Sequence, residues 1–183
     1  MNMSIAKDLY CAQQALFTLF SAANKLQIEG DRQLGDLTIR QMLAIPALYH
    51  APEGMATINH IARSLGTTKQ NAKQIIDAMA RKGYVSVAPS GVDRRAVNVA
   101  ITPDGEAAFQ ACSHRTDEFL AAIFSDFTSG ELASLCALLQ KLYRFDGAAQ
   151  QQFEHGHKID ADAETAILHH HPRFAELRAK GRE

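Results

Sequence analysis

The residues whose side chains could do the most chemistry stand together just after position 67. Six of them, in near succession, carry hydrogen-bonding groups: Thr68, Lys69, Gln70, Asn71, Lys73 and Gln74. The amides of Gln and Asn can pair with two edge atoms of adenine, and a Lys ammonium can reach guanine or a phosphate. The row therefore favours contact with duplex DNA. Many solvated helix faces have the same composition, so the elements around the row must show whether it contacts DNA or only water.

A helix is predicted to carry this row. Apolar residues recur among the polar ones at helical spacing: Ala72, Ile75, Ile76 and Met79. Thr67 with Gln70 fits a capping box, and Thr68 is a second candidate for the N-cap. Gly83 is the expected stop, because glycine favours the left-handed conformation that commonly ends helices.

Just upstream lies a second, shorter helical stripe, made by Ile58, Ile61, Ala62 and Leu65. Thr57 is its expected N-cap, and Gly66 marks its end. Two short helices joined by a tight, glycine-containing turn are the signature of a helix-turn-helix. The pairing makes the polar row the start of a predicted recognition helix.

A β-hairpin is predicted directly after the second helix. Apolar residues alternate along its two strands: Val85 and Val87, then Val97, Val99 and Ile101. Turn-forming residues lie between them: Pro89, Ser90, Gly91 and Asp93. Asp93, Arg94 and Arg95 stand near the tip. We expect the helix to enter the major groove and the basic hairpin to reach the adjacent minor groove.

This combination resembles the multiple-antibiotic-resistance regulator (MarR) family of winged-helix transcription factors. The matching text starts at LTIRQ, continues through INHIARSLGTTKQNAKQIIDAMARKGYV, and ends with DRRAVNVAITPDGEAAF. The resemblance covers residues 37–109. It implies that Arg95 enters the minor groove, that Asp93 orients it, and that Arg94 contacts a phosphate.

The resemblance also implies a mode of action. It implies repression by promoter occlusion, relieved by a small-molecule effector, and a homodimer formed by the terminal helices. The effector cleft would lie between the DNA-binding unit and the dimer helices, with its residues unknown. A two-fold dimer would place two recognition helices about 34–36 Å apart on an inverted-repeat site in double-stranded DNA.

Long helices are predicted on both sides of the DNA-binding segment. A first helix with apolar residues from Leu9 to Leu26 is followed by a polar loop, residues 27–36. Thr38 opens the next helix through a capping box with Gln41, and Pro46 is expected to kink or shorten it. Thr102 and Thr128 are the expected N-caps of two later helices. Their apolar faces exceed what one small domain can cover, which favours an identical partner.

The expected fold class is mainly α with a small β-hairpin wing. We predict an N-terminal dimerisation helix and loop over residues 1–36 and a winged helix-turn-helix over 37–102. C-terminal dimerisation helices follow over 103–145, and residues 146–183 form a histidine-containing extension of unknown role. Residues 55–102 hold seven Lys or Arg against two acids, although the whole chain has a net charge of -1. Positive charge thus gathers where phosphate contact is predicted.

The expected location is the cytoplasm, with no membrane association. No signal peptide is visible at the start, and no apolar run approaches the roughly 18 residues that a membrane span needs. The three cysteines, Cys11, Cys112 and Cys136, lie in helical patterns and are interpreted as buried structural thiols. No cofactor is expected. The motifs of common phosphate-binding, hydrolase or metalloprotease sites are missing from the sequence, so no enzyme activity is predicted.

Three alternatives stay open at this point. Five histidines in the extension (His155, His157, His169, His170 and His171) allow a metal-responsive regulator, since converging imidazoles bind transition metals. Cys11 allows a redox-responsive one, although only Lys7 is close enough in sequence to lower the pKa of its thiol. A winged helix used only for protein contact is the third alternative, against which the basic recognition face argues.

Overall fold

The hydrophobic core lies beneath the predicted DNA-binding helices. The computed structural model describes residues 2–51, 56–89, 97–147 and 171–180. Helices α2 (Ile39–Tyr49), α3 (Ile58–Ser64) and α4 (Lys69–Arg81) pack beside a hairpin of β1 (Val85–Pro89) and β2 (Val97–Ile101). Residues from all five elements are fully or nearly fully buried together, among them Leu37, Ile45, Ile61, Ile76, Met79, Val85 and Val99. The mainly helical fold with one hairpin wing is confirmed.

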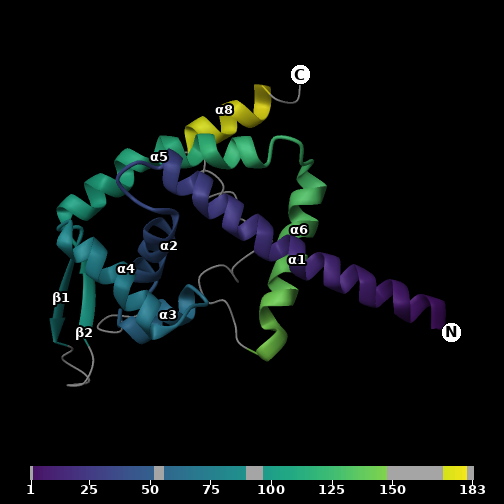
Figure 1. Ribbon diagram of the computed structural model, residues 1–183. Coiled ribbons are helices and arrows are strands. Elements are labelled where there is room, and N and C mark those ends of the chain that lie inside the picture. Colours follow the sequence, from purple (N-terminus) through teal and green to yellow (C-terminus); the bar gives the residue numbers. More distant parts are fainter. Residues whose placement is uncertain (1, 52–55, 90–96, 148–170, 181–183) are drawn as a thin grey trace.

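Three long helices extend beyond this core (Figure 1). They are α1 (Asn2–Gln33), α5 (Pro103–Ile123) and α6 (Ser129–Tyr143), the last followed by a short 3-10 turn, Arg144–Asp146. The N-terminal part of α1 runs away from the core, and α6 descends from the far end of α5. A last helix, α8 (Pro172–Lys180), packs on α5.

The predicted polar loop at residues 27–36 is wrong, because α1 continues to Gln33. Glu29 accepts hydrogen bonds from Arg32 and Gln33, so polar residues in this stretch satisfy one another along one helix face. Gly30 allows the start of α2 to come close: a Cβ at Gly30 would lie 2.8 Å from Ile39 Cδ1. The chain therefore turns only after Gln33, and Gly35 takes the left-handed conformation there.

Threonines begin the helices largely as expected. Thr38 and Thr128 form complete capping boxes, and Thr57 and Thr102 each accept from the backbone N–H three residues on. The start of α4 differs, because Thr68 accepts from Asn71 N at 3.2 Å. The predicted box between Thr67 and Gln70 is therefore wrong, and the second candidate cap is confirmed.

Two prolines lie inside elements that they were expected to interrupt. Pro46 lies within α2, and the helix continues to Tyr49, so the helix does not end there. Pro89 pairs with Val97 as the last residue of β1, rather than belonging to the turn. The end of a two-stranded edge tolerates proline, since no further strand needs its missing N–H. Residues 90–96, which include Asp93, Arg94 and Arg95, lie outside the described part of the chain.

The cysteines do not share one environment. Cys112 is buried, and its Sγ donates to Leu34 O at 3.2 Å. Cys11 and Cys136 are exposed, so the prediction of buried thiols is wrong for these two. They lie on α1 and α6, several of whose large apolar side chains are also exposed. Within the described ranges, no helix is both long and apolar enough to cross a membrane.

Candidate nucleic-acid interface

The start of α4 presents the predicted polar row to solvent. All six side chains from Thr68 to Gln74 that were singled out are exposed, whereas Ala72, Ile76 and Met79 of the same helix are buried. The helix therefore separates two functions by face. One face holds α4 in the core, and the other offers hydrogen-bond donors and acceptors.

Contacts within the chain divide this row into bound and available groups. Asn71 Nδ2 donates to Thr67 Oγ1 at 3.3 Å, and Lys73 forms an exposed ion pair with Asp77 at 2.6 Å. Lys69, Gln70 and Gln74 make no such contact with the described residues. An exposed ion pair contributes little to stability and is exchanged readily for a stronger partner. Lys73 can thus still turn toward a phosphate.

A hollow of about 400 Å³ lies between α3 and the start of α4. Asn59 and Arg63 of α3 line it together with Thr67 and Lys69, and Ala62 lies in its wall. Two basic side chains beside amide and hydroxyl groups suit a DNA phosphate, which accepts hydrogen bonds and carries negative charge. Sequence reasoning missed Asn59 and Arg63. Their position off the apolar stripe of α3 was the available signal.

One basic residue of this region faces the body of the chain instead. Lys82 Nζ donates to Asp36 O, and it lies 5.7 Å from the centroid of the Tyr84 ring. Lys82 thus ties the end of α4 to the segment before α2. It contributes to the positive potential without being placed for a groove contact.

The hairpin is fixed to α5 by a close backbone joint. Thr102 Oγ1 donates to Gly83 O at 2.6 Å, and Thr102 N donates to Tyr84 O at 3.0 Å. Gly105 permits the approach, because a Cβ there would lie only 2.0 Å from Tyr84 O. This joint fixes the start of α5 to the segment that links α4 to β1.

The histidine-rich extension contributes one described histidine, His171, which contacts Asp117 of α5 at 2.6 Å. In the part of the chain that the structure describes, no three His, Cys, Asp or Glu side chains converge on a metal position. The other four histidines of the metal hypothesis, His155, His157, His169 and His170, fall outside that part.

A sequence model of the MarR family matches residues 35–96. The match spans α2, α3, α4 and β1, which together form the core beneath the exposed row. This segment of the chain therefore resembles the MarR family.

Similar proteins and solved structures extend the likeness beyond that segment. The transcriptional activatory protein BadR of Rhodopseudomonas palustris is 27% identical over 147 residues, 75% of this chain and 83% of BadR. Bordetella bronchiseptica BpsR superposes with a TM-score of 0.62 at 20% identity, over 71% of this chain and 98% of BpsR. MepR in the S. aureus MepR–DNA complex superposes with a TM-score of 0.61 at 23% identity, over 72% of this chain and 95% of the MepR chain. At these identities the solved structures establish a shared fold.

Proposed function

We propose that this chain is a homodimeric, sequence-specific transcriptional regulator of the MarR type that reads duplex DNA with α4 and the hairpin. The observation that carries the proposal is the exposed trio Lys69, Gln70 and Gln74 at the start of α4, which makes no side-chain hydrogen bond or ion pair with the described residues, while the opposite face of the helix is buried in the core. The S. aureus MepR structure was determined with DNA, and its fold is shared here. A regulator of this kind works where the DNA is, and we place it in the cytoplasm.

Different residues are proposed for different parts of the DNA. Gln70, Asn71 and Gln74 would meet base edges, because their amides can both donate and accept. Thr68, Lys69, Lys73 and Arg63 would meet phosphates, which fix position without reading sequence. Arg95 of the wing would enter the minor groove with Asp93 beside it, and Arg94 would meet the backbone.

The dimer is proposed from exposed apolar side chains. On α1 these include Ile5, Leu9, Tyr10, Leu16, Phe17 and Phe20, and on α6 Leu138, Leu139 and Leu142. Monomeric proteins rarely leave contiguous apolar faces of this extent in water. A second copy would cover them and place the two α4 helices about one DNA turn apart.

For regulation, we propose repression by promoter occlusion that a small molecule relieves. The DNA binding of BpsR is described as regulated by 6-hydroxynicotinic acid, which supports effector control as a mode for this fold. BadR, a relative by sequence, is named as an activator, so activation is the alternative mode of regulation. A reporter placed behind the selected operator distinguishes the two: loss of the protein raises expression under repression and lowers it under activation.

Selection from a random duplex library tests the central claim. The purified protein should enrich an inverted repeat with half-sites about one helical turn apart, and its affinity should fall as salt rises. Recovery of unrelated sequences with only salt-steep binding would exclude sequence reading and favour a protein-contact module. Affinity that changes with the DNA sequence reports base contacts, whereas affinity that falls with salt reports phosphate contacts.

Point variants then assign the roles. Gln70→Ala should flatten base preference at one position of each half-site while leaving binding to unrelated duplexes nearly unchanged. Lys69→Ala should weaken binding to all duplexes alike and make the salt dependence shallower. Arg95→Ala should cost about 1–3 kcal/mol if the wing makes a close groove contact. Unchanged affinity in Arg95→Ala would remove the wing from the proposal.

A further inference from the structure

The C-terminal helix α8 is held on α5 by a buried carboxylate. Asp117 is 1% exposed, and its oxygens accept from His171 Nδ1 at 2.6 Å and from Phe174 N at 3.3 Å. A buried charge is costly unless it is paired and hydrogen-bonded. One hydrogen bond comes from His171, the residue just before α8, and the other from Phe174 N in the first turn of α8, so Asp117 of α5 acts as the N-terminal cap of another helix.

The other end of α8 holds the elbow, residues 124–128, that joins α5 to α6. Arg178 donates through Nη1 to Phe124 O and through Nη2 to Phe127 O, the latter at 2.8 Å. These carbonyls belong to the end of α5 and to the elbow itself. Arg173 adds an ion pair with Glu118 at 3.5 Å. Helix α8 thus spans the last two turns of α5 and fixes the place where the chain changes direction.

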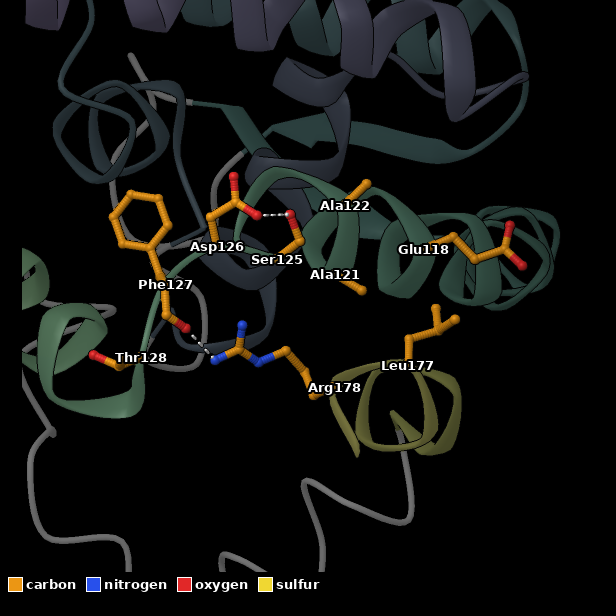
Figure 2. Close-up of a pocket in the computed structure, with 9 residues that line it drawn as sticks. All are labelled: Glu118, Ala121, Ala122, Ser125, Asp126, Phe127, Thr128, Leu177 and Arg178. Atoms are coloured by element: carbon orange, nitrogen blue, oxygen red, sulfur yellow. Dashed lines mark hydrogen bonds between the residues drawn. The ribbon is translucent and has the colours of Figure 1, made fainter. Parts of the chain in front are cut away.

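A cavity of about 730 Å³ lies between α8, the end of α5 and the elbow, with Arg178 in its lining (Figure 2). Leu177 and Arg178 of α8 face Ala121, Ala122, Ser125 and Phe127 across it. Polar contacts hold α8 at both ends, and its apolar residues Phe174, Ala175 and Leu177 are only half-buried against α5. Segments with few buried apolar contacts open at low free energy, so this attachment can release without unfolding the core.

The elbow is important because α5 and α6, which meet there, each contact the DNA-binding unit at their other end. Helix α5 starts at the backbone joint between Thr102 and Gly83. Helix α6 ends where Tyr143 OH donates to Arg63 O at 3.2 Å. The Tyr143 ring also lies 3.4 Å from where a Cβ of Gly66 would be, in the turn of the helix-turn-helix. The bend at the elbow, together with the Tyr143 contact, thereby fixes how the DNA-binding unit sits relative to α6 (Figure 1).

We propose that α8 is a clamp on the elbow that sets which half-site spacing the dimer accepts, with Asp117 and Arg178 as its positioning residues. The proposal rests on the proposed function, because it needs two DNA-binding units joined through α1 and α6. Helix α5 has 21 residues and spans about 32 Å at 1.5 Å per residue. A change of about 10° at the elbow would therefore move the DNA-binding unit by about 5 Å. That exceeds the 3.4 Å rise of one base pair.

The test uses the full chain and duplexes that carry the selected half-sites with the spacer shortened or lengthened by one base pair. Wild type should prefer one spacing by about tenfold, and Arg178→Met should reduce this ratio to about threefold or less, because two hydrogen bonds of the clamp are lost. Binding to a duplex with a single half-site should not change. Arg32→Met removes the same charge from the exposed end of α1 and should keep the wild-type ratio.

The double variant Asp117→Asn, Arg178→Met removes both anchors, and hydrogen exchange reports whether α8 has come loose. Loss of protection in α8 together with a flattened spacing preference is the expected result. Loss of protection with an unchanged preference would overturn the proposed role of the clamp. Retained protection would overturn the assignment of the anchors. If wild type does not bind even a single half-site, the proposed function fails first, and that outcome is seen separately.

Discussion

Replacing Gly105 with alanine should separate the joint between the hairpin and α5. An added Cβ would lie 2.0 Å from Tyr84 O, 2.8 Å from Tyr84 C and 2.9 Å from Ile101 Cγ1. Two of these are backbone atoms, which cannot rotate away as a flexible side chain can. Tyr84 O also accepts from Thr102 N, so moving it weakens the bond that holds the start of α5.

The expected cost combines three effects. Alanine is favoured over glycine inside a helix by about 1 kcal/mol. Overpacking of this kind costs about 1–3 kcal/mol, and a lost backbone hydrogen bond adds about 1 kcal/mol. Gly105→Ala should therefore lower the free energy of unfolding by about 1–3 kcal/mol.

Urea unfolding at a fixed protomer concentration measures this change, because association shifts the apparent stability. Gly130→Ala is the matched control. Gly130 lies in the first turn of α6, and a Cβ there would have no atom within 4 Å. The urea midpoint of Gly130→Ala should rise slightly, whereas that of Gly105→Ala should fall. If both midpoints rose together, the close approach between Gly105 and Tyr84 would be wrong.

Two further predictions concern stability. Met79 is fully buried between the recognition helix and the core, so Met79→Ala should cost about 2–5 kcal/mol in urea unfolding; a cost near zero would mean that the core beneath α4 is loosely packed. Glu131 accepts from Thr128 N at 2.8 Å, and this bond lowers the pKa of its carboxyl below the ordinary value. Its stabilisation is therefore present above the unfolded-state pKa and is lost as the pH falls through the lower, folded-state pKa. The stability difference between wild type and Glu131→Gln should shrink between about pH 6 and pH 3, and a difference independent of pH would exclude this origin.

Local rules predicted the DNA-binding core well, because its signals are short in range. Threonine caps, the glycine stops at Gly66 and Gly83, and the alternation in the hairpin each depend on a few neighbouring residues. The end of α1 could not be predicted in the same way. Its polar residues look like a loop, and the helix continues because Glu29 accepts hydrogen bonds from Arg32 and Gln33 and because Gly30 packs against Ile39.

The candidate site divides along the same line. The row on α4 follows from helical spacing, and its exposure agrees with that pattern. Asn59 and Arg63 join it only through the turn that brings α3 against the start of α4. The partner of Asp117 was also beyond the reach of sequence patterns, since His171 lies more than fifty residues away and looked like part of a histidine run.

The uncovered apolar side of α1 has a consequence for how much of this protein a cell maintains. Phe17 and Phe20 are more than half exposed in a single chain. Chaperones and proteases act on chains that display such surface, so a newly made chain without a partner is a better substrate for them than an assembled one. Chains made in excess of those that pair in the proposed dimer would be degraded. The amount of active regulator would then follow the rate at which chains meet rather than the rate at which they are made.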